Sequence, residues 1–231
     1  MNNRRAFVVA ALLSFALPAM ADSKDDAFFT SKRDFKKQYR TIALSPIDAD
    51  AVFNMPESVA AIIEQEVTNH LQKRGITVIP SSVLGGIRRT MEEQVGGVTD
   101  PESGATDMAK LRAVRTHAFR ELWYRHDIDA VATIRLSVTS AQFEKDRAEW
   151  DGVKQKVEHE GRDKGYSGKI AVSSIGFAVF DHSDRIRYQY YGGLEVLQKR
   201  IDARLEPIPA ERFFSDEKRI RKAAQIAVSP I

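Results

Sequence analysis

The chain has 231 residues, a formal net charge of +3 and no cysteine, which excludes disulfide bonds, cysteine metal ligands and a cysteine nucleophile. Hydrophobic residues make up 43% and charged residues 29% of the sequence, values typical of a globular domain with its own core. Without the two arginines near the N-terminus the net charge is 3 − 2 = +1, so charge gives no argument for a nucleic-acid partner.

Residues 1–21 have the pattern of a secretory signal peptide. Arg4 and Arg5 precede an apolar run at 6–17, and the small residues Ala19 and Ala21 follow. This run is shorter than the roughly 20 residues that cross a bilayer, so we expect a cleaved signal and no transmembrane segment. We expect cleavage after Ala21 and a periplasmic mature chain. An aspartate follows the cleavage site in place of a lipoprotein cysteine, and a twin-arginine signal remains the alternative export route.

Residues 22–40 form an N-terminal arm in which aromatic residues alternate with lysines and arginines. One interpretation is a terminal segment that packs a few aromatics on the domain and leaves its cations in water. The other is a contact with a membrane surface or a partner through residues such as Phe28 and Phe29. We favour the first, because chain termini are usually either docked or frayed.

Residues 41–231 predict one domain that begins with alternating strands and helices. A buried strand is expected at 41–47, an amphipathic helix at 57–73 and a second strand at 76–79. Gly75 suits the left-handed position that ends such a helix. Because strand, helix and strand follow one another closely, the two strands are expected to be parallel neighbours.

Two more helices are expected in the middle of the chain. The first covers residues 81–94 and is predicted to be capped by Ser81 or Ser82. A polar loop at 96–105 separates it from a long helix at 107–125, whose apolar residues recur at helical spacing.

Strands dominate the next part of the sequence. Alternating apolar and polar residues predict a strand at 130–138, and the pair Asp151-Gly152 predicts a tight hairpin turn. Strands at 169–180 and 185–196 are joined by a short polar turn, so they are expected to be antiparallel neighbours.

The C-terminal part is expected to end in a helix. Residues 205–209 contain two prolines and predict irregular structure, and a helix at 215–228 is expected to begin with Ser215 as its cap. Taken together, the elements indicate the α/β class: a single domain at 41–231 with a mixed parallel and antiparallel sheet flanked by helices.

Motifs for catalysis, cofactors and metals are lacking in this sequence. The five histidines do not have the spacing of a zinc protease, and the glycine pairs lack the spacing and lysine of a phosphate loop. Ser215 begins an S-x-x-K pattern without its companion motifs. We therefore predict no catalytic residue, no cofactor and no metal ligand. A hydrolase with a carboxylate and histidine site stays open, because an acid–base pair needs a cleft that only the fold creates.

Aromatic residues are the candidates for an interaction surface. In a strand, Tyr188 and Tyr190 share one face and Tyr191 points to the other. They either pack in a sheet covered by helices or bind a protein or glycan, since tyrosine is favoured at interfaces. Together with Phe28 and Phe29, they are the predicted contact residues.

The order of elements resembles a family of bacterial envelope proteins that includes the curli-secretion protein CsgG and the penicillin-binding-protein activator LpoB. The matching stretches include TIALSPI at 41–47, ITVIPSS at 76–82 and DIDAVATIRL at 127–136. This resemblance implies a mixed sheet flanked by helices and a binding or assembly role in the periplasm without catalysis. Two features depart from the family: the lipoprotein cysteine is missing, and residues 139–157 are too charged to face lipid.

The sequence therefore predicts a soluble periplasmic module that binds an envelope protein or a cell-wall component. Its partner and oligomeric state are left open.

Overall fold

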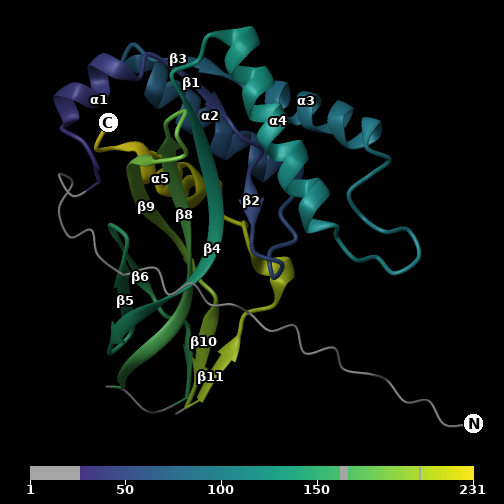
Figure 1. Ribbon diagram of the computed structural model, residues 1–231. Coiled ribbons are helices and arrows are strands. Elements are labelled where there is room, and N and C mark those ends of the chain that lie inside the picture. Colours follow the sequence, from purple (N-terminus) through teal and green to yellow (C-terminus); the bar gives the residue numbers. More distant parts are fainter. Residues whose placement is uncertain (1–26, 162–165, 203) are drawn as a thin grey trace, which may run out of the picture.

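A computed structural model describes residues 27–161, 166–202 and 204–231 (Figure 1). The predicted signal peptide at 1–21 lies outside the described residues. As the sequence predicts, the described chain forms a single α/β domain with a mixed parallel and antiparallel sheet.

The main sheet has a parallel half and an antiparallel half. Its central strands are β1 (Thr41–Leu44), β3 (Thr77–Ile79), β4 (Ala130–Glu144), β8 (Ser167–Phe180) and β9 (Ile186–Val196). The parallel strands have the order β3-β1-β4, as a crossover between the first two strands predicts. From β4 the sheet continues through β8 to β9 in antiparallel pairing.

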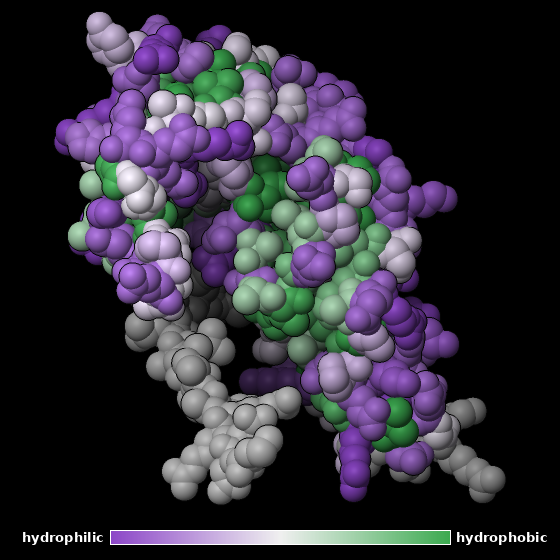
Figure 2. Space-filling model, turned by 90° about the vertical axis from the view of Figure 1, so that its right-hand side faces the viewer, coloured by the Kyte–Doolittle hydropathy of each residue, from purple (hydrophilic) through white to green (hydrophobic). Residues whose placement is uncertain are grey.

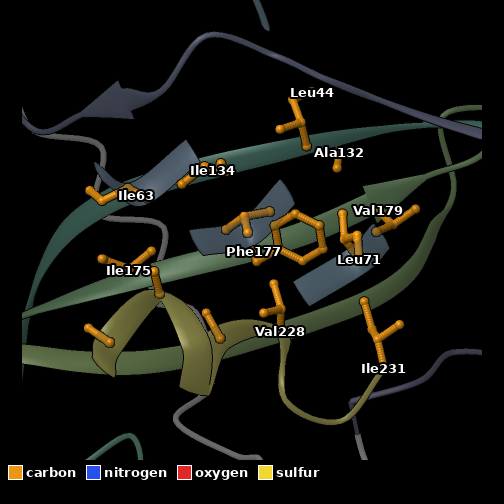
Figure 3. Packing of buried hydrophobic residues seen from close by; sticks show 14 of the residues in the cluster. Leu44, Ile63, Leu71, Ala132, Ile134, Ile175, Phe177, Val179, Val228 and Ile231 are labelled. Atoms are coloured by element: carbon orange, nitrogen blue, oxygen red, sulfur yellow. The ribbon is translucent and has the colours of Figure 1, made fainter. Parts of the chain in front are cut away.

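Helices cover one face of this sheet, and the largest part of the hydrophobic core lies between them and the sheet. Two of them, α2 (Glu57–Lys73) and α5 (Glu217–Val228), direct their apolar stripes at β4 and β8. In Figure 3, Phe177 of β8 lies beside Leu71 of α2 and Val228 of α5. All three side chains are fully buried.

Two other helices cover the opposite face, over β1 and the beginning of β4 (Figure 1). They are α3 (Ser81–Gln94) and α4 (Met108–His126). Buried residues of α4 and β4 form a separate apolar cluster, in which Leu122 and Val131 take part. The long strands β4 and β8 extend well beyond these helices.

A hairpin closes the far end of the sheet against β9. It consists of β5 (Arg147–Trp150) and β6 (Val153–Lys156), and it continues from β4. The Gly193 N–H donates a 2.9 Å hydrogen bond to the Asp151 carbonyl, and Gln155 Nε2 donates a 2.6 Å bond to the Leu194 carbonyl. A second apolar cluster that includes Trp150 fills this end.

Short elements complete the domain. The hairpin leads into a small sheet of β7 (His159–Glu160), β10 (Gln198–Ile201) and β11 (Arg204–Pro207). A 3₁₀ turn, η1 (Ala210–Arg212), then leads to α5. At the other end of the chain, α1 (Lys32–Gln38) precedes β1, and β2 (Asp48–Ala49) pairs with β4.

Several sequence-based boundaries are corrected by tertiary contacts. Strand β4 continues to Glu144, because β8 pairs with it along its whole length. Residues 205–209 are expected to be irregular, but 204–207 form β11 against β10, and Pro207 is tolerated because it ends an edge strand. Asp216 and not Ser215 caps α5 by accepting from the N–H groups of Lys218 and Arg219.

The predicted cap of α3 is also wrong. Pro80 occupies the cap position, and Ser81 is the first helical residue. The Ser81 hydroxyl donates a 2.6 Å hydrogen bond to the Glu64 carboxylate, which also accepts from the Ser81 N–H at 2.9 Å. A side chain of α2 therefore caps α3, which local sequence does not reveal.

Figure 2 shows the face that lies to the right in Figure 1. On this face, apolar side chains gather beside a hollow, and hydrophilic side chains surround them. Within the described ranges, no helix is both long and apolar enough to cross a membrane.

Candidate functional site

A groove of about 1150 Å³ lies between the β5–β6 hairpin, the small sheet and the segment that enters α5. Four separate stretches of the chain supply its walls: 145–146, 155–160, 195–200 and 208–219. Five lysine or arginine and five aspartate or glutamate side chains line it, so its formal charge is balanced. The groove therefore presents charged groups of both signs, which suits a ligand with both donors and acceptors.

Several of the charged side chains that line the groove are paired with one another. Arg212 binds Glu158 through two nitrogen–oxygen contacts of 2.6 and 3.2 Å, and Arg219 Nε lies 3.1 Å from an Asp216 carboxylate oxygen. Asp216 is additionally the cap of α5. The Arg212–Glu158 pair thus joins two walls of the groove, whereas Asp216 fastens the first turn of α5.

Glu195 differs from the other carboxylates of the groove. It lies between Leu194 and Val196 near the end of β9 and is half-buried. Burial raises the pKa of its carboxyl group, while a 3.3 Å hydrogen bond from the Phe214 N–H and the charge of Arg219 act to lower it. The net direction is upward, so Glu195 takes up a proton more readily than an ordinary glutamate.

Two polar atoms of groove residues have unused hydrogen-bonding capacity. Within the described ranges, His159 Nε2 and Gln155 Oε1 are buried and find no hydrogen-bond partner. Gln155 is held in place by the bond from its Nε2 to the Leu194 carbonyl. Buried polar atoms are nearly always satisfied, so these two are exceptions among the residues that line the groove.

The predicted contact residues do not lie in this groove. Tyr188 is fully buried, its hydroxyl donates a 2.8 Å hydrogen bond to the Ala227 carbonyl, and burial raises its pKa. Tyr190 packs against the main core, whereas Tyr191 is half-buried and its hydroxyl accepts a hydrogen bond from Gln189.

The neighbouring side chains of Phe28 and Phe29 have different environments. The Phe28 ring packs against those of Phe35 and Tyr188, with ring centroids 5.4 and 5.1 Å apart. Phe29 is 58% exposed, whereas the other four predicted contact residues are buried or half-buried. The structure therefore brings Phe28 and Tyr188 together, with Tyr188 in the core, and leaves Phe29 exposed.

Sequence reasoning missed the groove residues. The stretch 144–160 is rich in charged side chains, which also suits an ordinary solvated hairpin. Glu195 offered a clearer signal, because a lone carboxylate lies between the buried residues Leu194 and Val196. Within the described ranges, no group of three histidine, aspartate or glutamate side chains is arranged to hold a metal ion.

Comparisons with known proteins give little further information. No protein-family model and no curated protein matches the chain. Among solved structures, the chain is similar to a neuraminyllactose-binding hemagglutinin homologue from Helicobacter pylori, with 13% identity and a TM-score of 0.31. The similarity covers 87% of this chain and 84% of the other. At this TM-score it carries no argument about function, and the comparisons assign the chain to no family.

Proposed function

We propose that the protein is a periplasmic binding module, exported by its N-terminal signal, whose groove binds an envelope protein or a cell-wall component. The observation that carries this proposal is the groove itself, with the unbonded atoms His159 Nε2 and Gln155 Oε1 among its residues. The signal-peptide pattern of residues 1–21 and the resemblance to envelope assembly proteins support the compartment.

Binding suits the groove better than catalysis does. Glu158 is paired with Arg212 and Asp216 with Arg219, so both carboxylates already have a charged partner within the protein. A mixed set of charged side chains together with an aromatic ring from Phe213 fits recognition of a polar ligand.

Crosslinking from living cells tests the binding role. The wild-type protein is expected to form a defined crosslink in the periplasm, and Lys156→Glu and Glu195→Gln are expected to weaken it. Lys156 is an exposed groove residue, so its substitution leaves the fold intact. Glu149→Gln, outside the groove, serves as the control. A monomer without any crosslink, or equal crosslinking in all variants, contradicts the proposal.

Export is tested separately. Intact-mass measurement of the periplasmic protein is expected to give a chain that begins at Asp22. A cytosolic protein that still begins at Met1 contradicts the assigned compartment without bearing on the groove.

A hydrolase is the second candidate function, and one observation favours it. Glu195, whose pKa is raised by burial, lines the same groove as His159. A raised carboxyl pKa is what a general acid needs near neutral pH. Purified protein should then hydrolyse a chromogenic glycoside or peptide from a substrate panel, and Glu195→Gln should abolish turnover while preserving the circular dichroism spectrum. Turnover no faster than in buffer contradicts this candidate.

A further inference from the structure

Helix α4 carries a concentrated positive charge that lies apart from the groove. Its sequence contains five basic residues and one acidic residue, Glu121. The five are Lys110, Arg112, Arg115, Arg120 and Arg125, and all five are exposed. With histidines neutral, the net charge of this helix is 5 − 1 = +4, which exceeds the net charge of +3 of the whole chain.

Neighbouring carboxylates do not neutralise this charge. Glu121 is paired with Arg125 at 2.5 Å, and Arg115 lies over the Phe119 ring at 5.4 Å from its centroid. In the part of the chain that the structure describes, no carboxylate lies within ion-pair distance of Arg112 or Arg120. The packed helix α3 contributes two arginines and two glutamates, so it adds no net negative charge.

The outward face of α4 also differs from an ordinary solvated surface. Ala109, Ala113, Thr116, Arg120 and Tyr124 recur at spacings of three and four residues and are all exposed. Tyr124 is 90% exposed, which is extreme for an aromatic side chain. The small residues allow a partner backbone to approach closely, and the tyrosine and arginines are of the types that anchor interfaces.

We propose that the outward face of α4 is a docking surface for an acidic segment of another protein. Charge complementarity fixes the acidic character of the partner. The choice of protein over an anionic membrane rests on composition, because Arg112 and Arg120 at this face are arginines, and protein interfaces are enriched in arginine and tyrosine and depleted in lysine. Arg112 and Tyr124 are about 18 Å apart along the helix axis, so the matching acidic segment spans about three helical turns.

The test uses the mature protein and a fluorescein-labelled helical peptide of about 16 residues, with glutamates on one face and alanines and a leucine elsewhere. Fluorescence anisotropy is expected to give micromolar binding that weakens with salt. The double variant Arg112→Glu/Arg120→Glu should weaken binding at least about tenfold, and Tyr124→Ala at least about fivefold. The control Arg33→Glu/Arg204→Glu reverses exposed arginines elsewhere and should change binding less than about twofold.

Three outcomes would overturn this proposal. Equal losses in the control variant would reduce the interaction to bulk charge. An unchanged affinity of the Tyr124→Ala variant for the peptide would likewise mean that only bulk charge attracts the peptide. Sedimentation with phosphatidylglycerol vesicles that depends on Arg112 and Arg120, without peptide binding, would assign the face to a membrane. None of these results bears on the groove, because the two surfaces share no residue.

Discussion

Asp151 and Ser174 join the tip of the β5–β6 hairpin to the middle of the main sheet. The Ser174 hydroxyl donates a 2.5 Å hydrogen bond to Asp151 Oδ2, and the Asp151 carbonyl accepts from the Gly193 N–H at 2.9 Å. Asp151 and Gly152 both have positive φ angles, 40° and 75°, as a primed hairpin turn requires. The turn therefore serves both to reverse the chain and to fasten the hairpin to β8 and β9.

Asp151→Asn is expected to stabilise the protein at alkaline pH. Burial raises the pKa of Asp151, so the folded state holds this proton more tightly than the unfolded state, and stability falls as pH rises above the ordinary aspartate pKa. Asparagine keeps an acceptor for Ser174, removes the charge and suits the positive φ. In urea unfolding, the free energy of unfolding of the variant should exceed that of the wild type by on the order of 1 kcal/mol at pH 8 and should equal it at pH 3. A loss at pH 8 would show that the charged carboxylate is the stabilising form.

Gly192→Ala is expected to separate α5 from β9. A Cβ at Gly192 would overlap with the Ala223 carbonyl of α5 and lie 3.1 Å from the Ala227 nitrogen. Both neighbours are backbone atoms, so the helix must shift, at a cost of about 3 kcal/mol or more. Thermal unfolding measures the loss. Gly86→Ala in α3 is the matched control: nothing lies within 4 Å of its Cβ, and it should stabilise the protein by about 0.5–1 kcal/mol. Similar melting temperatures for both variants would contradict the close packing.

Asp181 is expected to stabilise the fold in a pH-dependent way. Its side chain is 4% exposed, and burial by itself would raise its pKa. Hydrogen bonds from Arg187, from Arg185 and from the Ser183 N–H outweigh burial and hold the pKa at about 2. This contribution is therefore complete above the ordinary aspartate pKa and is lost as pH falls toward 2.

The variant Asp181→Asn should lower the free energy of unfolding by about 2 kcal/mol at pH 7. The difference from the wild type should shrink to about half at pH 3, because the unfolded aspartate is then mostly protonated. Denaturant titrations at the two pH values measure it. A difference that does not change with pH would mean that the carboxylate contributes through shape and not through its charge.

Tyr188→Phe is expected to reduce stability without affecting any surface interaction. Its hydroxyl bonds to the Ala227 carbonyl inside the core, and the phenylalanine variant leaves that acceptor unsatisfied, at a cost of about 1–2 kcal/mol. Tyr190→Phe is the control, since its hydroxyl makes no hydrogen bond with the described residues. Guanidinium unfolding compares the two variants. Equal stabilities would show that the buried hydroxyl bond has no net value.

The sequence by itself determined the elements whose signals are local. The apolar spacing of residues 57–73 and the glycine at 75 predict α2 and its end, and φ at Gly75 is indeed 79°. Alternation in β4 and the Asp151-Gly152 pair predict a strand and a hairpin turn, because side-chain period and turn geometry depend on neighbours in the chain. The fold class followed from the order of these elements.

Only the tertiary structure decided what depends on residues far apart in the sequence. Glu64 caps α3 across 17 residues, and the length of β4 is set by β8. The groove is assembled from four separate stretches, and the raised pKa of Glu195 arises from their burial of its carboxyl group. Tyr188 became a core residue because α5 covers it. Desolvation and pairing act through space, and a linear pattern does not contain those distances.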